Sequence, residues 1–184
     1  MAYSEDPLPI WEIVREDTEL TLPILRLKRR RMRRPSDGKE GDFFIAEAPL
    51  WVNVIARTAD GDIVLVEQYR HGIHEISLEI PGGVADGTGS GLDAAKRELA
   101  EETGYTSERW TFLGSVSSNP AIFNNRCEMY LAEDCIRTQE QDLDPFEEIR
   151  VIRLKEADFL DAVRTGRIHH SLAVAAVGLW TLRD

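Results

Sequence analysis

The sequence predicts a mixed α/β fold, in which one β-sheet lies between helices. Short apolar segments alternate with turns rich in Pro, Gly and Asp, which is the pattern of strands. Three segments have helical features instead: 92–103, 156–165 and 171–182. Many strands with a few helices favour a sheet covered by helices. The 184 residues are enough for one domain with a substantial core.

Taken in order, residues 1–47 are expected to form an N-terminal β-ribbon extension and residues 48–184 the main domain. In the extension, the apolar residues from Leu20 to Leu27 indicate a strand, and residues 42–46 indicate a return strand after the turn at 35–39. Asp60-Gly61 is a hairpin signal in the main domain. The strands expected there are 51–56, 63–68, 110–113, 128–132 and 147–154.

Three glutamates share one face of the helix expected over residues 92–103. They stand at i, i+3 and i+4: Glu98, Glu101 and Glu102. Like charges at this spacing repel, so the cluster is tolerated best with a cation among them. Carboxylate oxygens suit Mg²⁺ or Mn²⁺, which combine protein carboxylates with substrate phosphates. The alternative is a solvated acidic face without a ligand.

The flanking residues predict that this helix is held in place. Ser90 and Asp93 have the spacing of a capping box, and Gly104 follows as a C-terminal glycine. An apolar stripe runs along the other side of the helix: Leu92, Ala95 and Leu99. The residues Ile80-Pro81-Gly82-Gly83 predict a sharp turn before it. Strand, turn and helix together form a cup suited to metal and phosphate.

This segment resembles the Nudix box, G-x5-E-x7-R-E-U-x-E-E-x-G-U, where U is a bulky apolar residue. The leading glycine matches Gly83, and the later matches are Arg97, Glu98, Leu99, Glu101, Glu102, Gly104 and Tyr105. Gly89 stands where the box has its first glutamate, which in the family mainly supports the loop and helix. The resemblance implies the Nudix fold and metal ligands on the second half of the box.

Two more segments resemble the ADP-ribose pyrophosphatase branch of the Nudix hydrolases, which reads LVEQYR…LExPAG. They are residues 63–72 and 78–83, with Gly82 in place of the branch's alanine, a small change. Residues 119–126 resemble a later loop of the branch in divergent form. The resemblance spans roughly residue 51 to the C-terminus. It implies metal-dependent hydrolysis of the diphosphate bond in a nucleoside diphosphate derivative. The leading substrate is ADP-ribose or another nucleoside-diphosphate sugar.

The resemblance also assigns roles at single positions. Gly82 is expected to offer its backbone carbonyl to a metal. The positions with structural roles are Gly83, Arg97 and Gly104. A general base must reach the attacking water, and in this branch it is a glutamate on a loop before a late strand. Glu147 is the first choice here and Glu148 the second, although both can be ordinary loop acids.

Three residues are candidates for substrate binding: Arg70, Glu79 and Trp51. Arg70 follows an apolar strand and can clamp a phosphate with two parallel hydrogen bonds, the alternative being a surface salt bridge. Glu79 precedes the turn and can bind a water-bridged metal or a ribose hydroxyl. Trp51 can stack on a base or belong to the core.

The net charge of −11 argues against a nucleic-acid-binding protein, although a bound cation would reverse the sign locally. The run from Lys28 to Arg34 is basic. It fits a phosphate or nucleic-acid patch, an exposed strand, or a patch given to a neighbouring subunit's diphosphate pocket. No apolar run approaches membrane-spanning length and the N-terminus lacks signal-peptide features, so we expect a cytoplasmic protein with no membrane contact.

A two-stranded ribbon is marginally stable alone and needs a surface to cover its apolar face. We therefore expect a C₂ homodimer with the N-terminal ribbon at the partner's pocket. Two other functions stay open for the main domain. One is a dinucleoside-polyphosphate hydrolase, and the other is a degenerate Nudix domain that senses such a ligand without cleaving it, supported only by Gly89.

Overall fold

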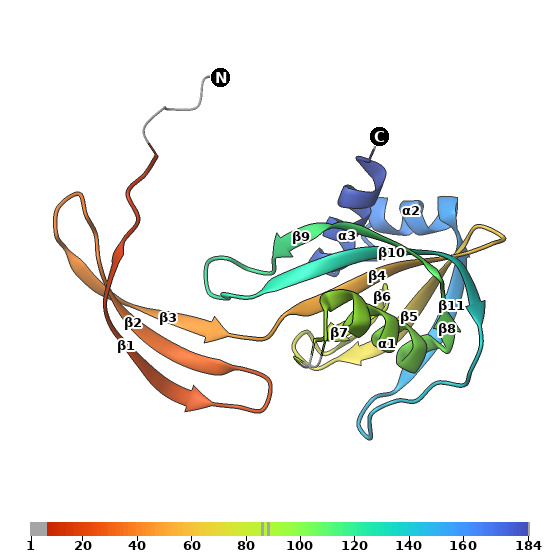
Figure 1. The fold of residues 1–184 in the computed structure, drawn as a ribbon, viewed down its shortest axis with the longest axis horizontal. Coiled ribbons are helices and arrows are strands. Elements are labelled where there is room, and N and C mark those ends of the chain that lie inside the picture. The colour runs from red at the N-terminus through yellow and green to blue at the C-terminus, as the bar shows by residue number, and fades with distance from the viewer. Residues whose placement is uncertain (1–6, 86, 88, 184) are drawn as a thin grey trace. The chain divides into compact units, whose positions relative to one another are not determined.

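The computed structural model describes residues 7–85, 87 and 89–183, which divide into two units (Figure 1). The first unit is the chain up to Ala48 together with Asn119–Asn124. The second is Pro49–Ser118 and the chain from Asn125 onward. The first unit therefore gains a short segment from the middle of the chain, which the sequence does not indicate.

The first unit is a three-stranded antiparallel sheet in the order β1-β2-β3. Its strands are β1 (Glu12–Thr21), β2 (Arg26–Arg33) and β3 (Glu40–Glu47). The strand expected from Leu20 to Leu27 is wrong, because the chain turns there and the Leu22 N–H donates to the Leu25 carbonyl at 2.9 Å. Pro23 cannot donate to a strand ladder, and it lies within this turn.

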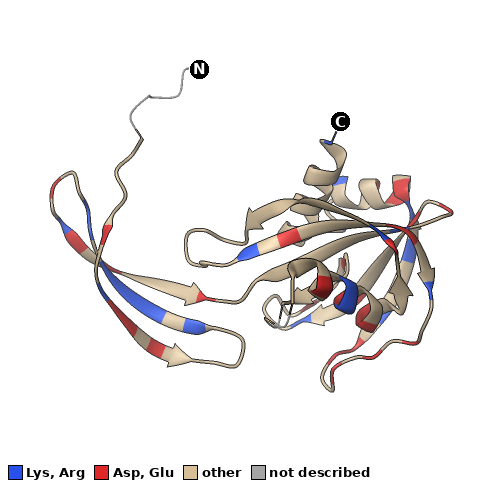
Figure 2. Ribbon diagram, viewed as in Figure 1, with Lys and Arg blue, Asp and Glu red and all other residues tan. Residues whose placement is uncertain are grey.

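The basic run forms β2, with acidic residues facing it from both neighbouring strands (Figure 2). Lys28 bonds Glu16 on β1 at 2.8 Å and Glu47 on β3 at 3.1 Å. Arg31 reaches Glu40 at 3.2 Å. The remaining pairs include Arg29–Asp17, Arg29–Glu19, Arg30–Glu16, Arg33–Glu12, Arg33–Glu40 and Arg34–Asp37. The run is an exposed strand whose charges are balanced within its own sheet.

The first unit leaves much apolar surface exposed. Ile13 is 51% exposed and Phe44 is 54% exposed. Other exposed apolar residues of this unit are Trp11, Val14, Leu20, Leu22, Ile24 and Phe43. Among the residues that the structure describes, none in this unit is fully buried. The sheet therefore has no core of its own.

The second unit is built on an eight-stranded mixed sheet. Its strands are β4 (Trp51–Thr58), β5 (Asp62–Arg70), β6 (Glu75–Glu79), β7 (Gly82–Val84), β8 (Tyr105–Thr106), β9 (Arg109–Ser117), β10 (Arg126–Arg137) and β11 (Ile149–Lys155). The main order is β11-β5-β4-β10-β8, with β6 on β5, β7 on β4 and β9 on β10. Only β4 and β10 pair in parallel within this described sheet.

Helices cover both faces of this sheet, so the predicted α/β fold is confirmed. Helix α1 (Gly91–Thr103) packs through Leu99 on one face, and α2 (Glu156–Arg164) packs through Phe159 on the other, together with α3 (Ser171–Thr181). Successive strand residues point into opposite cores: Val54 packs in the core under α1, and Ile55 packs in the core under α2 and α3. Within the described ranges, every helix is too short or too polar to cross a bilayer.

Candidate active site

Helix α1 starts and ends as its sequence predicts. The Ser90 N–H donates to the Asp93 carboxylate at 2.9 Å, and the Asp93 N–H donates to the Ser90 hydroxyl at 3.2 Å. Gly104 ends the helix with a φ of 75°. Gly89 has a φ of 152°, a conformation that side chains rarely adopt. The glutamate expected there would be strained, and the capping box holds the start of the helix instead.

The glycine turn lies directly against the carboxylates of α1. A Cβ added at Gly83 would stand 2.5 Å from the Glu98 carboxylate, so glycine is what allows this approach. A Cβ added at Gly82 would stand 2.2 Å from the Val52 carbonyl oxygen and 2.4 Å from the Asn53 side-chain nitrogen. Glycine in place of the branch's alanine is therefore no small change, because β4 occupies the space of the methyl group.

The three predicted glutamates lie together at this turn. Glu102 is 4% exposed and accepts a hydrogen bond of 2.9 Å from the Gly82 N–H. Arg97 pairs with Glu98 at 2.9 Å and with Glu101 at 2.8 Å. Its guanidinium also donates to the Val84 carbonyl at 3.0 Å. Arg97 thus ties the carboxylates to the turn, which is the structural contact expected of it.

The site carries excess negative charge in a poorly solvated place. Burial raises the pKa of Glu102 to about 8, and the charges of Glu98 and Glu147 act in the same direction against the Gly82 N–H and Arg70. Burial also raises the pKa of Glu98, although Arg97 opposes this. Several carboxylate oxygens without enough positive charge form a donor set that suits a hard divalent cation.

The carboxylates are not yet arranged as a ligand set. Among the described residues, no three His, Cys, Asp or Glu groups converge as they would around a metal ion. The reason lies in the contacts just given, since Glu98 and Glu101 face Arg97 and Glu102 faces the Gly82 N–H. The donor types fit a divalent metal, and binding requires these contacts to rearrange.

The acidic loop before β11 brings Glu147 to the same region. Its negative charge adds a small contribution, after burial, to the raised pKa of Glu98 and Glu102. The Glu147 carboxylate accepts a hydrogen bond of 3.2 Å from the Asp144 N–H. Glu147 and Glu148 are both exposed. Of the two, only Glu147 acts by its charge on the pKa of Glu98 and Glu102, which favours it as the candidate base.

Gln141 is a residue of this loop that the sequence does not single out. Its side-chain nitrogen donates to the Glu102 carbonyl at 2.6 Å and to the Ile149 carbonyl at 3.2 Å. The Asp142 N–H donates to the Glu101 carbonyl at 2.9 Å. These bonds join the last turn of α1 to the loop and to the start of β11. Backbone carbonyls accept all of them, so no residue pattern reveals them.

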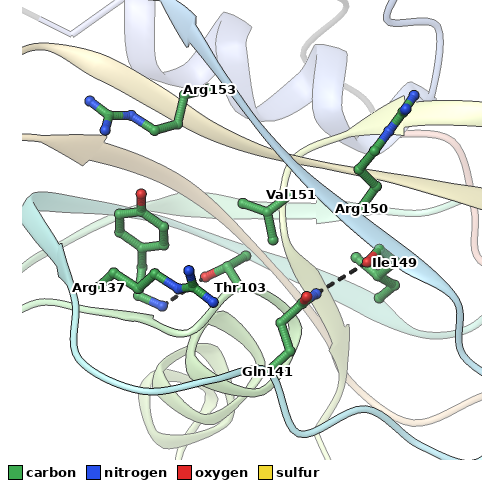
Figure 3. Close-up of a pocket in the computed structure, with 8 residues that line it drawn as sticks. Thr103, Arg137, Gln141, Ile149, Arg150, Val151 and Arg153 are labelled. Atoms are coloured by element: carbon green, nitrogen blue, oxygen red, sulfur yellow. Dashed lines mark hydrogen bonds between the residues drawn. The ribbon is translucent and has the colours of Figure 1, made fainter.

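Figure 3 shows a cavity of about 570 Å³ beside this bridge. Its lining is Thr103, Tyr105, Arg137, Gln141, Ile149, Arg150, Val151 and Arg153. The guanidinium groups of Arg150 and Arg153 point in different directions, toward Glu67 and Asp62 on β5. The cavity therefore does not gather its positive charges around one point.

Arg70 and Glu79, both predicted substrate ligands, bind each other. Two parallel hydrogen bonds of 2.8 Å and 2.7 Å join the guanidinium to the carboxylate. Burial alone would raise the pKa of Glu79, but Arg70 holds it below its ordinary value. His170, which the sequence does not assign, lies 3.8 Å away. Arg70 is near enough to Glu102 and Glu147 for their charges to raise its pKa.

Trp51 is half-buried at the start of β4 and packs against the core under α2 and α3. This favours the core interpretation of Trp51 over base stacking. The opposite core, under α1, contains Val52 and Val54 of the same strand. The side chains of β4 thus belong to the two cores, and its backbone pairs with β7, which carries the Gly82-Gly83 turn.

The fold and these carboxylates define the class of protein, an α/β domain whose central helix presents glutamates to a glycine turn. Comparison with known proteins agrees. The family model described as "NUDIX domain" matches residues 49–172. An ADP-ribose pyrophosphatase of Bacillus subtilis is 28% identical over 80% of each chain. A methanol dehydrogenase activator of Bacillus methanolicus is 33% identical over 80% of each chain.

Two other similarities extend this result. The ADP compounds hydrolase NudE of Escherichia coli is 26% identical over 68% of this chain and 67% of its own. A crystal structure of an ADP compounds hydrolase shares the fold with a TM-score of 0.83, at 21% identity, over 96% of this chain and 95% of that chain. The chain belongs to the NUDIX domain family. Members of this family generally use divalent metal ions.

Proposed function

We propose that this protein hydrolyses the diphosphate bond of a nucleoside diphosphate derivative, with ADP-ribose as the leading substrate and Mg²⁺ or Mn²⁺ as the metal. The observation that carries the proposal is the packing of two α1 glutamates, Glu98 and Glu102, against the Gly82-Gly83 turn, with Glu101 joined to Glu98 through Arg97. The names of the relatives, an ADP-ribose pyrophosphatase and an ADP compounds hydrolase, support the choice of substrate class.

In this proposal the metal is held by carboxylate oxygens and one backbone carbonyl, from Glu98, Glu101, Glu102 and Gly82. When bound, it neutralises phosphate oxygens and lowers the pKa of attacking water. Glu147 accepts a proton from this water while the water oxygen attacks a phosphorus atom. The bond from that phosphorus to the bridging oxygen breaks, and the bridging oxygen leaves on the other phosphate. Arg70 binds the diphosphate oxygens.

The test is a screen of nucleoside diphosphate derivatives with Mg²⁺ and with Mn²⁺, with products identified by mass. We expect ADP-ribose to give AMP and ribose 5-phosphate, and EDTA to abolish the reaction. Glu102→Gln should lower turnover by orders of magnitude. Glu140→Gln is the matched control, because this glutamate is 90% exposed and pairs only with Arg137 among the described residues.

Other outcomes of the screen decide against the proposal. Full activity in thoroughly metal-free buffer would sink the metal assignment. Preference for a dinucleoside polyphosphate would support the alternative hydrolase. Tight binding of ADP-ribose without cleavage of any compound would support a sensor.

We also propose a C₂ homodimer in which the first unit meets the partner. The support is its exposed apolar surface, including Ile13 and Phe44, together with the absence of any fully buried residue among those described there. Light scattering at micromolar concentration should exceed the monomer mass of 20.8 kDa. A monomer would refute the assembly. The cytoplasmic location stays a prediction.

Deleting residues 1–40 tests whether the extension contributes to the partner's site. We expect the truncated protein to have a higher KM, if it folds. The predicted role of Arg29, Arg31 and Arg33 at a partner's diphosphate requires each to leave carboxylates of its own sheet. A folded truncated protein with an unchanged KM would remove the extension from the site.

A further inference from the structure

Arg70 pairs with a buried carboxylate, and the proposed function also assigns it to the substrate diphosphate. Its Nε and Nη2 atoms bind the two oxygens of Glu79. The Glu79 side chain is 1% exposed, whereas that of Arg70 is 41% exposed. Arg70 also responds to the charges of Glu102 and Glu147. An arginine that binds a substrate phosphate from this position has to weaken its hold on Glu79.

His170 lies against the same carboxylate from another element. It is the residue before α3, and its side chain makes no capping hydrogen bond. Its Nδ1 atom is 3.8 Å from the nearer Glu79 oxygen, which is too far for a hydrogen bond. This atom is buried and has no hydrogen-bond partner in the described structure. A buried polar atom without a partner is uncommon in a native protein and calls for an explanation.

We propose that His170 takes over the Glu79 carboxylate as a hydrogen-bond donor when Arg70 turns to a substrate phosphate. The inference rests on the proposed function, which supplies the phosphate. Without His170, the departure of Arg70 leaves a buried carboxylate with only the hydrogen bond from Ser77, which is strongly unfavourable. A shift of about 1 Å brings the imidazole within hydrogen-bond distance.

The exchange does not require His170 to gain a proton. A neutral imidazole protonated on Nδ1 is already a donor. The groups acting on it are Glu79 on β6, Arg70 on β5 and the neighbouring His169. Ser77 adds a side-chain hydrogen bond to Glu79. His170 is thus a positioning residue: it acts on Arg70 through Glu79 and does not touch the substrate.

The first experiment needs no substrate. Arg70→Ala removes the guanidinium permanently, so His170 should then donate to Glu79. The ¹⁵N signals of the imidazole rings are compared between the wild-type protein and this variant, with His170→Gln used for assignment. We expect the neutral His170 ring in Arg70→Ala to carry its proton on Nδ1 and to donate it to Glu79. A folded Arg70→Ala protein with unchanged His170 signals overturns the proposal.

The second experiment separates positioning from general destabilisation and does not depend on Arg70→Ala. His170→Asn keeps a donor near the position of Nδ1, His170→Gln moves it outward, and His170→Leu removes it. With ADP-ribose, we expect the KM to rise roughly tenfold for Leu and Gln and at most about twofold for Asn, with kcat within about twofold throughout. Equal KM values in all three overturn the proposal, as does a fall in kcat that Asn does not restore.

The two experiments also separate this inference from the proposed function. If the wild-type protein does not hydrolyse ADP-ribose, the proposed function fails. The ring signals in Arg70→Ala still decide whether His170 takes over Glu79.

Discussion

The two units of this chain both contain β-sheets, but different interactions hold the sheets together. In the second unit, helices cover both faces, and residues such as Ile55 and Val64 are completely buried. In the first unit, basic residues of β2 pair with acids of β1 and β3, and no described residue is fully buried. One sheet is stabilised mainly by apolar burial and the other has charge pairs along exposed strands.

This difference shows why only the second unit is suited to carry a precise site. Apolar burial contributes about 25 cal/mol per Å² and fixes side chains in place. Exposed ion pairs contribute little individually and are screened by salt. The charge pairs of the first unit join neighbouring strands, but they do not bury its apolar residues, which stay exposed.

The largest expected effect tests the assignment of catalysis to the second unit alone. We expect Glu147→Gln to lower kcat roughly 10²–10⁴-fold, the range for loss of a general base, with little change in KM. Glu148→Gln and Glu19→Gln, the latter in the first unit, are the controls and should keep kcat. Steady-state kinetics gives kcat and KM for the three variants and for the wild-type protein. A large loss for Glu148→Gln, with kcat kept in Glu147→Gln, would show that Glu148 is the base.

The next effect compares one phenylalanine in each unit. Phe159→Ala removes a completely buried ring and should lower the free energy of unfolding by about 3–5 kcal/mol. Phe44→Ala removes a ring that is 54% exposed and should change it by about 0.5 kcal/mol or less in a monomer. Denaturant unfolding measures both. A larger, concentration-dependent loss for Phe44→Ala would show that a second copy covers this ring.

A smaller effect tests close packing where α1 begins. A Cβ added at Gly91 would stand 1.9 Å from a Glu128 carboxylate oxygen and 2.9 Å from the Tyr130 hydroxyl. The Glu128 side chain can move away, so Gly91→Ala should destabilise the protein by only about 1 kcal/mol. Gly178→Ala in α3 is the matched control, because a Cβ there meets nothing within 4 Å. Adding Glu128→Ala should restore much of the stability lost in Gly91→Ala. Thermal unfolding of the three variants checks this, and equal effects of both glycine changes would contradict it.

The smallest expected effect concerns salt and acid. Hydrogen bonds from Arg33 and Arg31 lower the pKa of Glu40, and those from Lys28 lower the pKa of Glu47. Stabilisation from such groups is present above the ordinary glutamate pKa and is lost as the pH falls through the lowered values, below about pH 4. High salt should weaken the same pairs.

Amide hydrogen exchange measures this effect strand by strand. Protection against exchange, taken relative to the intrinsic rate at each pH, should fall in β1–β3 in 1 M NaCl and in acid before it falls in β4 and β5. A parallel loss of protection in both units would show that the charge pairs do not distinguish them.

Local signals predict much of the fold. The capping residues Ser90 and Asp93 and the terminal Gly104 mark α1 correctly, because caps depend on neighbours in the chain. The strand predicted through Leu22 is wrong, because the prediction relied on the apolar residues and ignored Pro23, which interrupts a strand. Strand β1 was not predicted. The inclusion of Asn119–Asn124 depends on pairing between distant segments, which local patterns do not specify.

The candidate site also contains features that local sequence predicts and features that depend on contacts between distant segments. The α1 glutamates follow from helical spacing and from the resemblance. The space taken at Gly82 depends on how closely β7 approaches β4. The pairing of Arg70 with Glu79 depends on the β5–β6 hairpin, and the approach of His170 depends on the packing of α3. Only the folded chain brings these residues together.

The bonds of Gln141 have a mechanical consequence. With the Asp142 N–H, this side chain fastens one end of the acidic loop to the last turn of α1, and the other end enters β11 at Ile149. The segment bearing Glu147 is therefore a short arc with both ends anchored. In the proposed function, a displacement of α1 on metal binding would also displace this arc. Metal binding by the helix and the position of Glu147, the proposed base, would then be coupled.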